Sequence, residues 1–122
     1  MCGRYVLPDE DSIGEYWAIN RCFCRGWFKP RFNVPPTAQV PIIVKAEGQL
    51  YLRSARWGLI PGWWTKDTPP SATFNARSED AAQKPTWRDS YRNRRCLMPA
   101  RGWYEWKAGE QVQGGAGRPV KQ

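Results

Sequence analysis

The sequence contains no histidine and only four cysteines, Cys2, Cys22, Cys24 and Cys96. Structural zinc sites are built from histidines and from cysteine pairs that are usually separated by two or more residues, whereas a single residue separates Cys22 from Cys24. The spacing supports a disulfide framework equally poorly. We therefore expect a protein without a metal ion or other cofactor.

Long apolar runs are also missing, since no stretch approaches the roughly 20 apolar residues that cross a membrane. The opening segment, MCGRYVLPDED, reaches Pro8 and three acidic residues before any such run, which argues against a signal peptide. We therefore expect a cytoplasmic protein with reduced thiols and no membrane partner.

Acidic residues are scarce relative to basic ones: Asp and Glu number 11 against 19 Lys and Arg, a net charge of +8. This excess favours an anionic partner, with nucleic acid first and a membrane surface second, although a merely soluble basic protein would share it. The 8 Trp, 5 Tyr and 4 Phe are too many for a small core, so some should line a surface or cleft.

The length of 122 residues and the 11 Gly and 11 Pro predict one loop-rich domain rather than a helical bundle. In the first half we expect a strand at 3–7, then a helix from Pro8 to Ile19 with Ser12 and Glu15 as a capping box. A short extended piece should follow within 20–37. A β-hairpin over 38–61 should turn at Glu47-Gly48, with Pro41 marking an edge strand or a strand start.

In the second half we expect a loop over 61–73, then a short helix capped by Ser78 and ended by Pro85. A strand should cover 94–107, with a bulge at Pro99 or Gly102. Residues 108–122 read as a Gly-rich hairpin loop. The predicted class is α+β, mainly antiparallel β with short helices, and the stop without a closing strand suggests an incomplete domain.

The chemistry of Cys2 depends on its position. Removal of Met1, which so small a second residue permits, would leave an amine and a thiol on adjacent carbons. An α-amine with a pKa of about 7.7–8.0 and a free thiol with one of about 8.5 are both partly nucleophilic near neutral pH. An aldehyde would condense with the amine to an imine, and the thiol would then close a thiazolidine ring. Arg4, on the same face of an extended segment, would favour the thiolate and bind an anionic substrate. The alternative is a cysteine that is second by chance.

Two further motifs carry polar residues that could assist. In RGWYEWK, strand alternation places Glu105 beside Trp103, where desolvation would raise the pKa of the carboxyl and suit it to acid–base catalysis. In FNARSED, Asn75 could orient a hydroxyl or carbonyl and Arg77 could bind a phosphate. The alternatives are an exposed glutamate in an ion pair, and an asparagine in a turn beside a solvated arginine.

Basic and aromatic residues are interleaved over 84–107, which contains seven cations, two acids and five aromatic rings, and Trp63 and Trp64 stand on a loop. Cations that follow phosphates and flat rings that stack on bases are typical of single-strand binding surfaces. A solvated basic face over an aromatic core would give the same pattern.

Five segments in this order, MCGRY, RFNVPPTAQVPIIV, RWGLIPGWW, FNARSED and RRCLMPARGWYEWK, resemble the SRAP family, the SOS response-associated peptidase domain. The resemblance covers residues 2–107. It implies a barrel-like fold and a DNA damage function: detection of abasic sites in single-stranded DNA and covalent crosslinking to the ring-opened sugar through a thiazolidine at Cys2. The family name adds a peptidase activity, tied to release of the N-terminal residue.

The resemblance also implies roles for individual residues. Asn75 would orient the opened sugar, and Glu105 would transfer protons in imine formation and ring opening. The DNA would be bound by Arg4, Arg77, Trp63, Trp64 and Trp106. The protein would act as a monomer and associate with the nucleoid when bound to DNA.

The sequence departs from this family in length, since SRAP domains are about twice as long and include a histidine that assists the chemistry. We therefore regard 1–122 as a single, incomplete SRAP domain. Two other functions stay open: an N-terminal-nucleophile peptidase or amidohydrolase with Cys2 as nucleophile and its own amine as base, and a truncated, non-catalytic single-strand binder.

Overall fold

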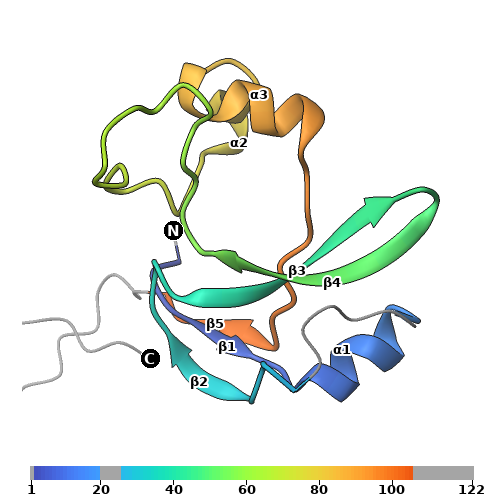
Figure 1. The fold of residues 1–122 in the computed structure, drawn as a ribbon. Helices are drawn as coiled ribbons and strands as arrows, with labels where there is room; N and C mark the ends of the chain where they lie inside the picture. The colour runs from blue at the N-terminus through green and yellow to red at the C-terminus, as the bar shows by residue number, and fades with distance from the viewer. Residues whose placement is uncertain (1, 20–25, 106–122) are drawn as a thin grey trace, which may run out of the picture.

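The computed structural model describes residues 2–19 and 26–105 and contains two antiparallel sheets. The first sheet has the strand order β2-β1-β5, with β1 at Tyr5–Leu7, β2 at Arg31–Val34 and β5 at Gly102–Trp103. The second is a hairpin of β3, Gln39–Ala46, and β4, Gln49–Arg56 (Figure 1). The predicted α+β class, with antiparallel strands and short helices, is confirmed.

The β3–β4 hairpin turns where the sequence predicts. Glu47 and Gly48 have φ angles of 50° and 76°, and positive φ at both central residues matches the twist of the flanking strands. On its other side, β3 has one described neighbour, Leu97, which exchanges two backbone hydrogen bonds of 2.8 and 3.0 Å with Ile43. Pro41, which cannot donate to a ladder, therefore lies in a strand paired fully on one side only, as expected.

The core consists of two apolar clusters. The larger joins both sheets and contains Tyr5, Leu7, Val34, Val40 and Trp57. In the smaller, Ile13 of helix α1 packs against Ile43 and Leu52 of the hairpin. Helix α1, Glu10–Tyr16, therefore covers the second sheet with its single buried side chain.

The first helix starts within the predicted segment Pro8–Glu10, but the predicted cap and the predicted C-terminal end are wrong. Asp9, not Ser12, is the N-cap: its carboxylate accepts hydrogen bonds from the Ser12 amide at 2.8 Å and the Ser12 hydroxyl at 2.7 Å. These bonds hold the pKa of Asp9 below its usual value, because they favour the charged carboxylate. The helix ends at Tyr16 rather than Ile19, since Ala18 adopts a positive φ of 51°.

The second half also departs from expectation. Ser78 is the first residue of α2, Ser78–Ala81, and caps nothing, because the N-cap position belongs to Arg77. Pro85 does not end a helix but begins another, α3, Pro85–Asn93. Proline suits a first helical turn because its missing N–H would have no partner there. The single strand expected over 94–107 is instead a bridge at Leu97 and the short β5.

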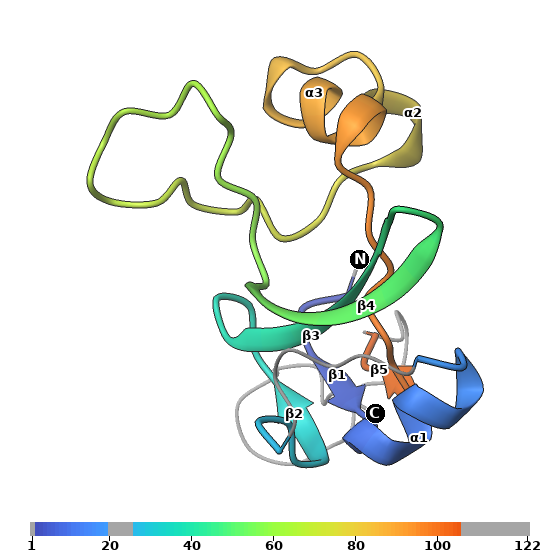
Figure 2. The same ribbon diagram turned by 45° about the vertical axis from the view of Figure 1, so that its right-hand side comes forward.

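Helices α2 and α3 pack on each other and form a small lobe that stands away from both sheets (Figures 1 and 2). The lobe is connected to the hairpin by the long loop after β4, and to the first sheet by the segment that follows α3. Functional residues on this lobe are therefore positioned by its loops rather than by the sheets.

The buried Tyr5 should make the stability of the fold depend on pH in the alkaline range. Burial raises the pKa of Tyr5 from 10.0 to about 12, although the charge of Arg31 acts the other way. Because the folded state prefers the protonated phenol, stability that is present below pH 10.0 should be lost as the pH rises towards about 12. Urea unfolding at pH 9 and pH 11 checks this. Between these two pH values, the free energy of unfolding should fall less in Tyr5→Phe than in the wild type.

The Tyr5 hydroxyl is buried and has no hydrogen-bond partner among the described residues, so Tyr5→Phe should be at least as stable as the wild type at neutral pH. The matched control is Tyr16→Phe, because the Tyr16 side chain is 81% exposed. This variant should lose as much stability between pH 9 and pH 11 as the wild type does. An equal loss in wild type and Tyr5→Phe would contradict the assignment.

Candidate functional site

Cys2 lies half-buried against the larger core cluster, and its position is defined by two hydrogen bonds. Its thiol donates to the main-chain carbonyl oxygen of Arg4, with an Sγ–O distance of 2.9 Å. The chain bends at Gly3, so the extended segment expected to align Cys2 with Arg4 is wrong. The thiol instead turns back over its own chain, and the Arg4 group that it meets is a carbonyl rather than the guanidinium.

The second hydrogen bond connects Cys2 to Asn75, a residue 73 positions away. The side-chain amide of Asn75 donates to the carbonyl oxygen of Cys2, with an Nδ2–O distance of 2.6 Å. The assignment of nitrogen to this atom is chemically required, because the amide oxygen would repel the carbonyl. Two residues that the sequence singled out separately are therefore in direct contact.

Asn75 is positioned by Trp57, which sequence reasoning missed as a site residue. The indole N–H of Trp57 donates to the carbonyl oxygen of Phe74 at 3.0 Å, immediately before Asn75. The Trp57 ring is 7% exposed and packs edge-on against Tyr5, at 5.3 Å and 90°, and against Phe74, at 6.1 Å and 81°. Such edge-to-face pairs and a satisfied indole donor hold a ring in one orientation.

The two ends of the long loop meet beside the same ring. Leu59 donates its N–H to the carbonyl oxygen of Thr73 at 2.9 Å, so the two ends of the loop meet beside Trp57. The loop therefore returns Asn75 to the first sheet, where β1 begins. Only the places of Trp57 in RWGLIP and of Phe74 in FNARSED could have indicated this role from the sequence.

Glu105 lies on a third segment, which is hydrogen-bonded to the backbone beside Cys2. Tyr104, its neighbour, donates its N–H to the Arg4 carbonyl oxygen at 3.0 Å, the same oxygen that accepts the Cys2 thiol. The expected packing of Glu105 among indoles is wrong, because Glu105 is exposed and Trp103 is 67% exposed. The hydrogen bond of Tyr104 therefore attaches the segment of Glu105 to Arg4, whereas the Glu105 side chain is not buried as predicted.

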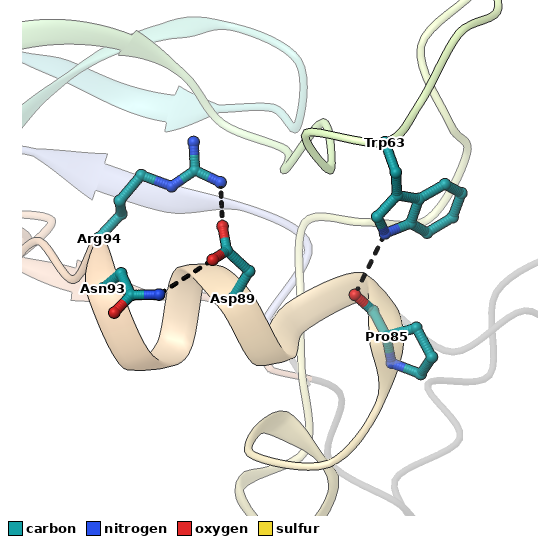
Figure 3. A network of polar contacts seen from close by, with 5 residues as sticks. All are labelled: Trp63, Pro85, Asp89, Asn93 and Arg94. Atoms are coloured by element: carbon teal, nitrogen blue, oxygen red, sulfur yellow. Dashed lines mark hydrogen bonds and ion pairs between the residues drawn. The ribbon is translucent and has the colours of Figure 1, made fainter.

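Trp63 and Trp64 lie on the long loop and are held by other partners. The Trp63 indole N–H donates to the carbonyl oxygen of Pro85 at 3.3 Å, which joins the loop to α3 (Figure 3). The Trp64 indole N–H donates to Thr68 at 2.9 Å, and the two rings lie 6.0 Å apart. Trp63 is 57% exposed, so this ring presents an apolar surface to solvent.

A cavity of about 230 Å³ separates the Trp63 loop from α3 and includes Gly62, Trp63, Thr86 and Ser90 in its lining. At its edge, the carboxylate of Asp89 accepts hydrogen bonds from Asn93, at 3.0 Å, and from Arg94. These bonds hold the pKa of Asp89 below its usual value. The charge of Arg94 is therefore paired with that of Asp89 (Figure 3).

The remaining residues predicted to bind DNA are not brought together by any hydrogen bond of the described chain. Arg77 is exposed and caps the N-terminus of α2, and the side chain of Arg4 is half-buried. Trp106 and the predicted loop at 108–122 lie outside the described residues. Over residues 2–19 and 26–105, no cluster of His, Cys, Asp or Glu could hold a metal ion, and no described helix is long and apolar enough to cross a membrane.

Comparison with known proteins gives consistent matches. Residues 1–119 match the model of the family described as SOS response associated peptidase (SRAP). The abasic site processing protein YoqW of Bacillus subtilis (strain 168) is 36% identical over 108 residues, covering 88% of this chain and 48% of that protein. The abasic site processing protein HMCES of Xenopus tropicalis is 27% identical over 131 residues, covering 88% of this chain and 39% of that protein.

Among solved structures, a crystal structure of a protein from Bordetella bronchiseptica matches with a TM-score of 0.68 and 24% identity. The match covers 86% of this chain and 51% of that one. The chain therefore spans about half the length of the curated relatives and of the solved structure that it matches.

Proposed function

The chain belongs to the SOS response associated peptidase (SRAP) family, and on that premise we propose that it processes abasic sites in single-stranded DNA by covalent crosslinking at Cys2. The relatives named above are abasic site processing proteins, which supports the lesion as the substrate. The observation that carries the proposal is the hydrogen bond from Asn75 to the Cys2 carbonyl oxygen, because it holds a polar side chain beside the proposed nucleophile.

The proposed reaction begins with loss of Met1, which exposes the amine of Cys2. That amine attacks the aldehyde carbon of the ring-opened abasic sugar, and the resulting carbinolamine loses water to form an imine. The thiol sulfur then bonds to the imine carbon and its proton passes to the nitrogen, which closes a thiazolidine. The net change joins protein and sugar with release of one water, and nothing is oxidised or reduced.

The hydrogen bond to Arg4 describes the resting state of the thiol. A thiol can donate to a carbonyl oxygen, whereas a thiolate would be repelled by it. Addition of the sulfur to the imine carbon therefore requires the thiol to leave this contact. The half-buried position beside the core limits the directions in which it can move.

Each of the other candidate residues has its own role in the proposed reaction. Asn75 orients the Cys2 backbone and, when the sugar is bound, a sugar hydroxyl or carbonyl oxygen. Glu105 transfers protons in imine formation and sugar ring opening, and its exposed carboxylate is accessible to a bound sugar. In this proposal Arg4 and Arg77 bind flanking phosphates, while Trp63, Trp64 and Trp106 contact bases.

The test is a denaturing gel with a single-stranded oligonucleotide that carries one abasic site. The wild-type chain should give a shifted band with this strand, and none with an intact strand or with one whose sugar aldehyde has been reduced to an alcohol. Intact mass spectrometry of the band should give the protein without Met1 plus the oligonucleotide minus one water. An unshifted abasic strand, under conditions where Met1 is absent, would refute the proposal.

A peptidase activity is the second candidate, because the family description itself includes it. Cys2 would then act as an N-terminal nucleophile with its own amine as the base. Hydrolysis of a peptide by the same preparation without DNA, together with no crosslink, would favour this activity.

A further inference from the structure

Helix α3 has two faces with different partners. One face meets the Trp63 loop, where the carbonyl oxygen of Pro85 accepts a hydrogen bond from the Trp63 indole N–H (Figure 3). Thr86 and Ser90 line the cavity between the loop and the helix. The cation that lines this cavity has an acidic partner, since Arg94 pairs with Asp89. This side of the lobe is therefore occupied and locally neutral.

The other face is basic and aromatic. Arg88, Tyr91 and Arg92 are spaced i, i+3 and i+4, which places them together on a helix surface. Arg95 follows the helix and returns to the same face, where its guanidinium carbon lies 4.8 Å from the centroid of the Tyr91 ring. All four side chains are exposed, and none of the three arginines forms an ion pair within the described residues. We call Arg88, Tyr91, Arg92 and Arg95 the outer α3 face.

Within the described residues, neither Arg88 nor Arg92 forms an ion pair that would offset their mutual repulsion. Like charges one helical turn apart repel, so Arg88 and Arg92 weaken the helix unless an anion lies between them. Arg92 can interact favourably with the negative C-terminal end of the helix, but Arg88 is too far from that end to do so. An anionic partner would relieve the repulsion between them.

We propose that the outer α3 face binds the phosphates of the single strand that continues away from the abasic site, with Tyr91 available to stack on a base. This inference rests on the proposed function for the identity of the strand. Guanidinium groups match phosphate geometry, and a flat ring beside them is typical of single-strand binding surfaces. A vesicle surface would need an apolar face on the helix, whereas the outer α3 face offers a single ring, 41% exposed.

The experiment measures how salt weakens binding of an intact single strand to the full chain. Neutralising a phosphate releases counterions, so each contact adds about 0.7 to the slope of log affinity against log salt for single strands. The variant Arg88→Gln/Arg92→Gln/Arg95→Gln should therefore reduce that slope by about 2. The variant Arg88→Lys/Arg92→Lys/Arg95→Lys keeps the charge and should restore most of the slope.

The matched control is Lys29→Gln/Lys45→Gln/Arg53→Gln, which removes the same charge from exposed positions outside α3. If this control lowers the slope as much as the α3 variant, the net charge and not the outer α3 face binds the strand, and the inference is overturned. Loss of binding to phosphatidylserine vesicles with an unchanged DNA slope would likewise overturn it, in favour of a lipid surface.

The outcome is separable from that of the proposed function. An abasic strand of only a few nucleotides should still crosslink to the α3 glutamine variant at the wild-type rate, because Cys2 lies against the core cluster of the sheets, whereas α3 stands in the lobe away from them (Figure 1). If no strand crosslinks to the wild type, the proposed function fails, while the slope on intact strands still decides whether the outer α3 face binds DNA.

Discussion

Replacing Cys2 with serine is expected to reduce the reductant-free crosslink to an abasic strand below detection. Serine is as small as cysteine, so Met1 is still removed and the N-terminal amine can still form an imine. The imine hydrolyses readily, and only the thiol can close the thiazolidine that makes the product persist. On a denaturing gel, the Cys2→Ser variant should therefore show a shifted band only when borohydride is added to reduce the imine.

The matched control uses the other free cysteine of the described chain. Cys96 is exposed and lies outside the core clusters that surround Cys2, so Cys96→Ser should crosslink as the wild type does. A Cys2→Ser variant that forms a stable crosslink without borohydride would show that the thiol is not used. A band lost equally in both variants would point to a general effect of thiol removal on the fold.

The parts of the fold that could be predicted are those determined by local chemistry. The hairpin is the clearest, because β-branched residues surround a turn pair that tolerates positive φ. The helix after Pro8 was also predicted, but two cap-forming side chains, Asp9 and Ser12, compete within one turn. The structure resolves this competition in favour of Asp9, which accepts both hydrogens that Ser12 offers.

Other elements depend on information that local patterns do not carry. The sequence predicts a helix end at Pro85, yet proline is equally suited to the first position of a new helix. The strand predicted over 94–107 is divided because this segment leaves one sheet for the other: Leu97 pairs with Ile43 in β3, whereas Trp103 pairs with Tyr5 in β1. Alternation along the chain cannot show such a change of partner.

In the candidate site, too, local patterns indicate single residues but not the contacts between distant ones. Position indicates Cys2, and local motifs indicate Asn75 and Glu105, to which the family resemblance adds a sugar substrate. No local pattern predicts that a residue 73 positions away donates to Cys2. Nor does it predict that Trp57 would hold the intervening turn through Phe74. The desolvation proposed for Glu105 assumed that strand neighbours bury it, whereas Trp103 is itself largely exposed.

Changing Asn75 to aspartate should slow crosslinking by roughly 10- to 100-fold, the scale expected when an orienting hydrogen bond is lost. Aspartate has nearly the same shape, but it replaces the donor with a carboxylate oxygen that faces the Cys2 carbonyl at a distance of 2.6 Å in the native contact. The repulsion displaces the N-terminal residue from the bound sugar. Single-turnover crosslinking rates at saturating protein measure the effect, because the added negative charge should also weaken affinity for the strand.

Stability separates this role from a purely structural one. Loss of one hydrogen bond costs about 1 kcal/mol of stability, so urea unfolding of Asn75→Asp gives the folded fraction by which its crosslinking rate is corrected. Trp57→Phe provides an intermediate case, because it keeps an aromatic ring against Tyr5 but removes the indole donor to Phe74. Its crosslinking rate should fall between those of the wild type and Asn75→Asp. An Asn75→Asp variant that crosslinks at the wild-type rate would show that the contact with Cys2 supports the fold and not the reaction.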